Sequence, residues 1–214
     1  MCSMVHSSPI RFFCPVVLIA VGMLGSVRRA EAIVMDFNHL VGGGDGTVSR
    51  GPVYIEDGIR LDNLSGGEFK SIHPPNFRYS SSVSFYNNIQ NGVTQLTMSG
   101  GSAFDFVSID LDGLNGSANY NGYPQPAYFL FVGTLPNLSL VYADFSTDHI
   151  FPDRQTFLLP STFDNVIRVT WAQDNGYPRP SQQFDTIVVN AVPEPATALV
   201  LLSCAFLAIR RKRS

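Results

Sequence analysis

Residues 104–111 read Phe-Asp-Phe-Val-Ser-Ile-Asp-Leu. Each polar residue in this stretch, Asp105, Ser108 and Asp110, lies between two apolar ones. Apolar and polar residues that alternate with a period near two are typical of a β-strand with one buried face. The stretch therefore predicts a strand in a sheet that covers a core on one side and faces solvent on the other.

Similar runs of strand length, rich in β-branched and aromatic residues, recur on both sides of this stretch. They are residues 83–86, 93–98, 127–132, 138–142, 166–171 and 184–189. Clusters of Gly, Pro, Asn and Asp separate them, and no part of residues 33–191 keeps a helical period. Many short strands joined by turn-rich segments predict an all-β domain, an antiparallel β-sandwich or jelly roll.

Charge and cysteine are unevenly distributed along the chain. Residues 33–192 hold 15 acidic and 7 basic residues, and the other 7 basic residues lie near the two ends. An acidic middle argues against binding to nucleic acid, which needs a basic patch on the folded domain. Cys2, Cys14 and Cys204 all lie in the terminal apolar segments. We therefore expect neither a disulfide nor a thiolate metal site in the middle domain.

The N-terminal residues have the three parts of a secretory signal peptide. Arg11 supplies a positive charge, residues 12–24 form an apolar run, and Ala30-Glu31-Ala32 is a small-x-small cleavage site. We expect a signal helix, export through the Sec machinery and cleavage after Ala32. An uncleaved N-terminal anchor is the alternative.

The C-terminal residues combine a proline motif, an apolar run and a basic end. Val192-Pro193-Glu194-Pro195 precedes the apolar residues 196–209, which are followed by Arg210, Arg211, Lys212 and Arg213. Proline restrains its own φ and its predecessor, so Pro-Glu-Pro stays extended. The apolar run would form a short hydrophobic helix of roughly 21 Å, less than the ~20 residues of a full membrane span. The basic residues are expected to remain on the cytoplasmic side.

This order of features resembles the PEP-CTERM sorting signal of Gram-negative bacteria. The resemblance implies recognition by exosortase, a membrane-embedded cysteine protease-transpeptidase. It also implies a transient anchor in the inner membrane, followed by delivery to the cell surface or to an extracellular polysaccharide matrix such as a biofilm. An ordinary tail anchor is the alternative, but it explains neither Pro-Glu-Pro nor the short span.

The end of the middle domain carries a second resemblance. The stretch Phe184-Asp185-Thr186-Ile187-Val188-Val189, with the strand before it, is similar to the final strands of jelly-roll domains in PEP-CTERM proteins. Those domains are similar in plan to carbohydrate-binding modules. A sugar-binding role drawn from this likeness is an analogy, because a fold does not determine a function.

A repeated hexapeptide supplies candidate ligand contacts. Residues 121–126 read Asn-Gly-Tyr-Pro-Gln-Pro, and residues 175–180 read Asn-Gly-Tyr-Pro-Arg-Pro. Asn-Gly favours a turn, and a residue before proline is extended, so each loop would present its tyrosine from a stiff backbone. Tyr123 and Tyr177, with Trp171 on the strand that enters the second loop, are candidate contacts for sugar rings. The alternative is that the same turn chemistry was simply used twice.

Metal, cofactor and catalytic signals are weak. Carbohydrate-binding jelly rolls often hold a structural calcium ion near their first and last strands, and Glu56, Asp57 and Asp185 lie at comparable places. Calcium needs six to eight oxygen ligands, so three scattered carboxylates define no site, and we predict neither a metal nor a cofactor. The sequence has no Gly-x-Ser-x-Gly and no His-Glu-x-x-His motif, and His39, His73 and His149 lack ligand spacing.

The sequence thus predicts an exported, non-enzymatic protein in three parts. These are a signal peptide (1–32), a β-sandwich domain (33–191) and a sorting signal (192–214). The expected role is structural or the binding of extracellular polysaccharide. The alternative is a secreted polysaccharide-active enzyme, a glycoside hydrolase or lyase, on the same scaffold.

Overall fold

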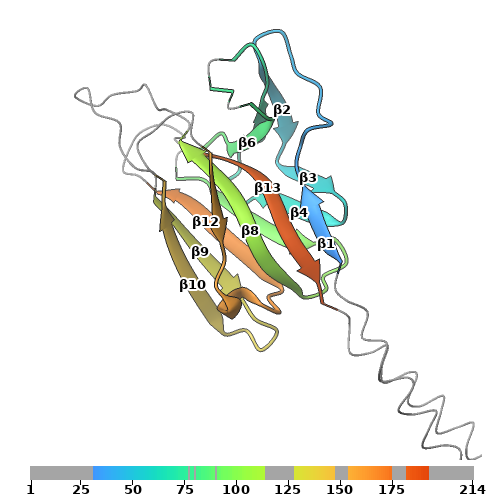
Figure 1. Cartoon of the computed structure of the whole chain (residues 1–214), viewed down its shortest axis with the longest axis vertical. Helices are drawn as coiled ribbons and strands as arrows, with labels where there is room; N and C mark the ends of the chain where they lie inside the picture. Colours follow the sequence, from blue (N-terminus) through green and yellow to red (C-terminus); the bar gives the residue numbers. More distant parts are fainter. Residues whose placement is uncertain are drawn as a thin grey trace, which may run out of the picture.

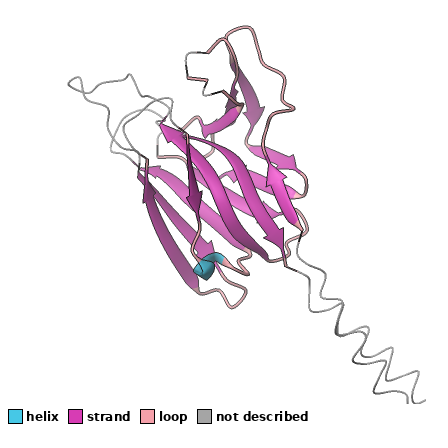
Figure 2. Ribbon diagram, in the orientation of Figure 1, coloured by secondary structure: helices cyan, strands magenta, loops and turns pink. Residues whose placement is uncertain are grey.

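The computed structural model describes residues 31–76, 78–79, 81–89, 91–113, 128–147, 154–174 and 182–192. Strands make up nearly all of the regular structure in these residues (Figure 2). The strands are β1 (Ala32–Met35), β2 (Thr47–Gly51), β3 (Val53–Glu56), β4 (Ile59–Asn63), β5 (Phe69–Ile72), β6 (Ser84–Asn87), β7 (Val93–Met98), β8 (Phe104–Gly113), β9 (Tyr128–Thr134), β10 (Leu140–Ser146), β11 (Gln155–Leu158), β12 (Arg168–Asp174) and β13 (Gln182–Ala191). A short 3-10 helix, η1 (Ser161–Phe163), lies between β11 and β12.

The strands form two antiparallel sheets packed face to face (Figure 1). Sheet A has the order β11-β8-β13-β6-β5-β2, with β1 also paired to β13, and sheet B has the order β10-β9-β12-β7-β4-β3. From β6 onward the chain changes sheet at every step except between β9 and β10. The predicted antiparallel β-sandwich is therefore confirmed.

The core between the sheets is rich in phenylalanine. Trp171 of sheet B meets Phe184 of sheet A edge to face at 5.4 Å, and Phe106 lies 6.0 Å from Phe131 across the same interface. These geometries suit the aromatic quadrupole and add to the stabilisation from buried apolar area. The largest fully buried side chains are Trp171, Phe37, Phe69, Phe85, Phe104, Phe106, Phe129, Phe131, Phe163, Phe184, Met35 and Ile59.

The central strand β8 changes its buried face partway along. Phe104 and Phe106 are buried near its start, whereas Ile109 and Leu111 are buried near its end, so the alternation shifts by one residue. The pairing of β8 with β13 shows two register shifts in the same region, on both sides of Val188. An extra residue in one strand moves the following side chains to the other face, so these irregularities keep all four apolar side chains in the core.

The seven predicted strand segments all correspond to strands. Residues 93–98 match β7 at both ends, and the other six overlap β6, β8, β9, β10, β12 and β13 within a few residues. The predicted terminal helices fall in residues 1–30 and 193–214, outside the described residues. Within the described part of the chain, no helix is long and apolar enough to cross a membrane.

Candidate functional site

The outer face of sheet B carries large side chains that the core does not use. In β10 exposed residues alternate with half-buried ones, and the first residues of β9 alternate between exposed and buried, because neighbouring side chains of a strand point to opposite faces. Phe129 and Phe131 therefore enter the core, while Tyr128 (58% exposed) and Leu130 (51%) face outward. On β10, Tyr142 (60% exposed) faces outward as well. We call the outward-facing residues Tyr128, Leu130, Val132, Leu140 and Tyr142 the aromatic face.

The strand register aligns these residues into rows across the sheet. One row runs through five strands and contains Tyr142, Val132, Thr170, Gln95 and Asp62, each directly opposite the next. At about 4.8 Å between strands, this row is roughly 19 Å long. It begins with an aromatic ring and ends with polar groups, so a ligand lying along it would meet both stacking surface and hydrogen-bonding partners.

Polar side chains flank the aromatic face. Arg168 donates from Nη2 to Thr134 Oγ1 at 3.3 Å, next to Leu140, which is opposite Thr134. On the other flank, Arg60 holds Asp62 through its Nε and Nη2 atoms at 2.6–3.0 Å. A few well-placed polar groups around an apolar surface are what gives orientation and specificity to a ligand site.

Trp171 does not belong to this face, and its prediction as a sugar contact is wrong. Its side chain is 1% exposed and packs between Phe131 and Phe184. The alternation of β12 explains this position, because Val169 and Trp171 share the inward face while Arg168 and Thr170 point outward. The same alternation, visible in the sequence, was the signal that could have placed Trp171 in the core.

Tyr123 and Tyr177, the other two predicted contacts, lie outside the described residues. The residues that flank their segments are nevertheless informative. Gly113 is opposite Gln182, and Tyr128 is opposite Asp174, so the described residues that flank the two segments are paired with each other within each sheet. Tyr128 of the aromatic face is one of these flanking residues.

Glu56, Asp57 and Asp185, the three carboxylates considered for calcium, do not form one ligand group among the described residues. Asp57 lies in the tight turn between β3 and β4 with a positive φ of 49°, whereas Asp185 is buried on β13 and paired with Arg154. Glu56 instead joins Asp36 and His39, whose ligand atoms all lie within 4.8 Å of one another. In the residues that the structure describes, this is the group of three that could hold a metal ion.

The cluster around Glu56 has a defined hydrogen-bond pattern. His39 Nδ1 lies 3.3 Å from Glu56 Oε1, and the Tyr54 hydroxyl donates to Glu56 Oε2 at 2.9 Å. Asp36 Oδ1 accepts a hydrogen bond from the backbone N–H of Asn38 at 3.1 Å. Burial and the hydrogen bond to Glu56 raise the pKa of the Tyr54 hydroxyl well above its usual range, so Tyr54 stays protonated as a donor.

His73 and His149 take no part in this cluster. His73 is 3% exposed, and its Nε2 lies 2.8 Å from Ser71 Oγ and 3.2 Å from Arg50 Nη2. Burial, followed by the Arg50 charge, lowers the pKa of His73, which favours a neutral structural histidine. His149 lies outside the described residues.

Asp185 lies opposite Asp110 on the neighbouring strands β13 and β8. Opposite residues have Cβ atoms about 5 Å apart. Two carboxylates placed in this way can reach the roughly 5–10 Å separation of the carboxyl groups in glycoside-cleaving enzymes. However, Asp185 is 1% exposed, and its oxygens accept from Ser82 Oγ, Arg154 Nη1 and the backbone N–H of Thr186. Burial raises the pKa of Asp185 to about 6, although Arg154 and Ser82 act in the opposite direction. We assign this carboxylate to the stability of sheet A.

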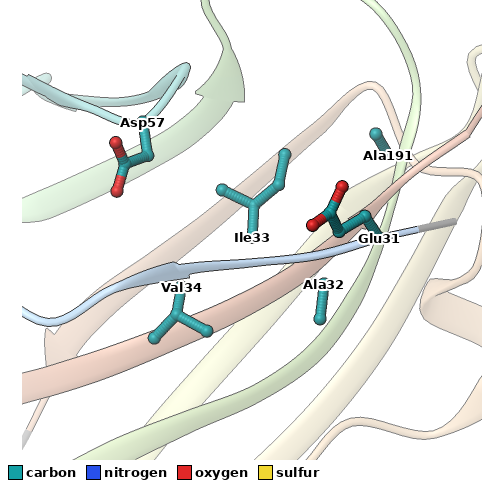
Figure 3. Close-up of a pocket in the computed structure, with 6 residues that line it drawn as sticks. All are labelled: Glu31, Ala32, Ile33, Val34, Asp57 and Ala191. Atoms are coloured by element: carbon teal, nitrogen blue, oxygen red, sulfur yellow. The ribbon is translucent and has the colours of Figure 1, made fainter.

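A shallow cavity of about 490 Å³ lies beside β1 and the end of β13 (Figure 3). Its lining residues are Glu31, Ala32, Ile33, Val34, Asp57 and Ala191, and the carboxylates of Glu31 and Asp57 lie on opposite sides of it. The predicted cleavage after Ala32 would remove Glu31 and Ala32 from this wall. A chain cleaved there would lack two of the six lining residues, so we do not propose a binding site in this cavity.

The predicted export signals lie largely outside the described residues. Ala32 is the first residue of β1, and Val192 follows the end of β13, where its N–H donates to Ala103 O at 3.2 Å. Ala30, Pro193, Glu194, Pro195, Arg210, Arg211, Lys212 and Arg213 are not among the described residues.

Comparisons with known proteins found only distant structural similarity. No protein-family model matches the sequence, and no curated protein matches it. Similar solved structures include the CBM22-1 xylan-binding domain from Paenibacillus barcinonensis Xyn10C, with 12% identity over 77% of this chain and 97% of that chain and a TM-score of 0.39. A carbohydrate-binding module of family 29 has 14% identity over 76% of this chain and 89% of that chain, with a TM-score of 0.36. Values this low establish neither membership of a family nor a ligand.

Proposed function

We propose that this chain is an exported β-sandwich protein that binds extracellular polysaccharide through the aromatic face of sheet B. The observation that carries the proposal is the pair Tyr128 and Tyr142, each more than half exposed on the same face of neighbouring strands. Large exposed apolar side chains that gather on one face of a soluble domain mark interaction sites more often than chance placement.

The spacing of the two tyrosines favours a chain of sugars over a single sugar. Tyr142 is opposite Val132, and Tyr128 lies four residues before Val132 on β9. At about 3.3 Å per residue along the strand and 4.8 Å between strands, the two Cα atoms are roughly 14 Å apart. An extended oligosaccharide would contact both rings, and its hydroxyl groups would reach neighbouring polar side chains such as Thr170 and Asp144.

Chemistry also favours a polysaccharide over a charged polymer. A tyrosine presents a flat apolar ring with a polar tip, which suits a sugar that has an apolar ring face and hydroxyl groups at its edge. The domain between residues 33 and 192 has an excess of acidic residues, which disfavours nucleic acid. A neutral or sparsely charged polysaccharide is therefore the proposed ligand.

Export and sorting complete the proposal. The signal-peptide pattern ending at Ala32 and the PEP-CTERM-like order of Val192-Pro193-Glu194-Pro195, apolar run and basic end support delivery through the Sec machinery and processing by exosortase. The domain would be anchored transiently in the inner membrane of a Gram-negative bacterium and then released to the cell surface or extracellular matrix. Its non-enzymatic role there would be to hold polysaccharide.

Affinity electrophoresis tests the binding role directly. The purified full chain is run through native gels that contain one polysaccharide each, including material extracted from the producing cells. Retardation that is lost in the double variant Tyr128→Ala/Tyr142→Ala, and retained in Leu158→Ala, supports the proposal. Leu158 is a suitable control because it is 72% exposed but lies on β11 of sheet A.

A second double variant separates the two predicted tyrosine surfaces. Tyr123→Ala/Tyr177→Ala removes the hexapeptide tyrosines and leaves the aromatic face intact. Loss of retardation in this variant alone would move the ligand from sheet B to the hexapeptide segments. Retardation that survives in both double variants would contradict the proposed site.

A further inference from the structure

We infer that Asp36, His39 and Glu56 form a binding site for a divalent transition-metal ion of the Zn²⁺ class. The three residues come from different parts of the N-terminal region. Asp36 directly follows β1, His39 lies in the connection to β2, and Glu56 ends β3. This inference is independent of polysaccharide binding, because none of the three belongs to the aromatic face.

The distances fit a small tetrahedral metal. Zinc binds histidine nitrogen and carboxylate oxygen at about 2.0–2.2 Å, so two ligand atoms on one edge of a tetrahedron lie about 3.3–3.5 Å apart. His39 Nδ1 and Glu56 Oε1 are 3.3 Å apart, and the ligand atom of Asp36 lies within 4.8 Å of both. The Asp36 side chain is half-buried and has no ion pair among the described residues, and a modest rotation of it would bring the third oxygen into range.

The charge of the cluster favours a cation. Glu56 has a side chain only 11% exposed, and its ion-pair partner among the described residues is His39, which is 60% exposed. Among the described residues, the two carboxylates of Asp36 and Glu56 therefore have one ion-pair partner, His39. Arg50, whose charge acts on the neighbouring Tyr54, donates its hydrogen bonds elsewhere, to Val41 O, Ser71 Oγ and the His73 ring. A buried carboxylate without a full counter-charge is costly, and a bound divalent ion would remove that cost.

The donor set indicates the kind of metal. Imidazole nitrogen suits Zn²⁺, Ni²⁺ and Cu²⁺, whereas calcium prefers six to eight oxygen ligands. One nitrogen and two carboxylates also leave a coordination position for water, as in three-ligand zinc sites. Tyr54 would not bind the metal itself but would orient a ligand, because its hydroxyl donates a hydrogen bond to Glu56 Oε2.

The location indicates what the metal would do. β1 belongs to sheet A, and β3 is the edge strand of sheet B. A metal held by Asp36, His39 and Glu56 would therefore connect the two sheets at one side of the sandwich. It would also fix the first residues of the domain, which follow directly on the predicted signal cleavage.

Zinc titration of the full chain tests the inference. Cys2, Cys14 and Cys204 are first blocked by alkylation, and the protein is freed of metal with a chelator. Calorimetry is then expected to show one Zn²⁺ per chain, with at least about tenfold weaker binding in His39→Ala and in Glu56→Gln. Asp57→Asn is the matched control, because it removes the neighbouring carboxylate at a positive φ that asparagine tolerates.

Two further readouts separate a metal site from a simple His–Glu hydrogen bond. Zn²⁺ should raise the thermal midpoint of the wild type and of Asp57→Asn but not of His39→Ala, and Ca²⁺ at the same concentration should not. In the wild type, Zn²⁺ should shift the NMR signals of the His39 ring and leave those of His73 in place. Equal zinc binding by wild type and His39→Ala, or no shift of the His39 ring, would overturn the inference.

Discussion

Ala32, the first residue of β1, is directly opposite Asn190 near the end of β13. The two ends of the described domain therefore lie side by side at one end of sheet A (Figure 1). Both predicted export signals join the domain at this end, the signal peptide before Ile33 and the sorting signal from Val192 onward. A chain cleaved after Ala32 would begin inside a strand, with Ile33 opposite Val189.

This arrangement gives a prediction for processing. Protein recovered from the cell surface or medium should begin at Ile33 and lack residues 210–213, because the proposal has both signals removed during export and sorting. Intact-mass analysis of cell fractions measures this directly. A mature species that still carries Arg210 to Arg213 would defeat the sorting proposal, while leaving the fold and the binding face untouched.

Asp185 should make the domain less stable as the pH rises from about 4 to 7. Burial raises its pKa from 3.8 to about 6 in the folded state, so the folded protein binds this proton more tightly than the unfolded chain. The stabilisation is fully present below about pH 4 and is lost as the pH passes through about 6. A shift of this size corresponds to about 2–3 kcal/mol.

Urea unfolding of the wild type and of Asp185→Asn across this pH range isolates the effect. The difference in unfolding free energy, wild type minus variant, should fall by about 2–3 kcal/mol between pH 4 and pH 7. The variant also removes a partner of Arg154, and the effect of that ion pair on ionised Asp185 is already contained in the pKa of about 6. A difference that stays flat or rises with pH would show that Asp185 is not buried as described.

Trp171 should be important for stability and irrelevant to ligand binding. Trp171→Ala is expected to cost about 3–5 kcal/mol in urea unfolding, because a large, fully buried ring is removed. Trp171→Phe should cost less, about 1–2 kcal/mol, since the ring Nε1–H is buried without a hydrogen-bond partner among the described residues.

The fluorescence of Trp171 tests whether this residue takes part in ligand binding. It is the single tryptophan of the chain, so its emission reports on the core alone. A bound polysaccharide should leave the emission maximum unchanged, and Trp171→Phe should bind like the wild type. A shifted maximum on binding would return Trp171 to the list of ligand contacts.

The fold was predictable from the sequence where the strands have six or more residues rich in β-branched and apolar side chains. Residues 93–98 read Val-Thr-Gln-Leu-Thr-Met and form β7 with the same bounds. The short strands β2 and β5, with Thr-Val-Ser-Arg-Gly and Phe-Lys-Ser-Ile, were not singled out. Four or five residues give too few alternations to be told from a loop, and long-range pairing decides their conformation.

The candidate sites were less accessible from the sequence because they depend on strand order. Tyr142 and Tyr128 can each be assigned to an outward face by alternation, but their shared surface exists only because β10 pairs with β9. Likewise, Asp36, His39 and Glu56 have no ligand spacing, and the structure brings them together by placing the end of β1 beside the edge strand β3. Trp171, in contrast, was assigned to the wrong face, although the alternation of residues 168–171 in its own strand indicates an inward position.

The dissociation constant of one oligosaccharide, taken from a polysaccharide that retards the protein, tests the central claim most directly. Calorimetry should show binding to the wild type, with an affinity about tenfold or more lower in Tyr142→Ala and lower again in Tyr128→Ala/Tyr142→Ala. Tyr142→Phe, which keeps the ring, should stay within about threefold of the wild type, since the ring supplies most of the contact. Wild-type affinity in the double variant would contradict binding on the outer face of sheet B.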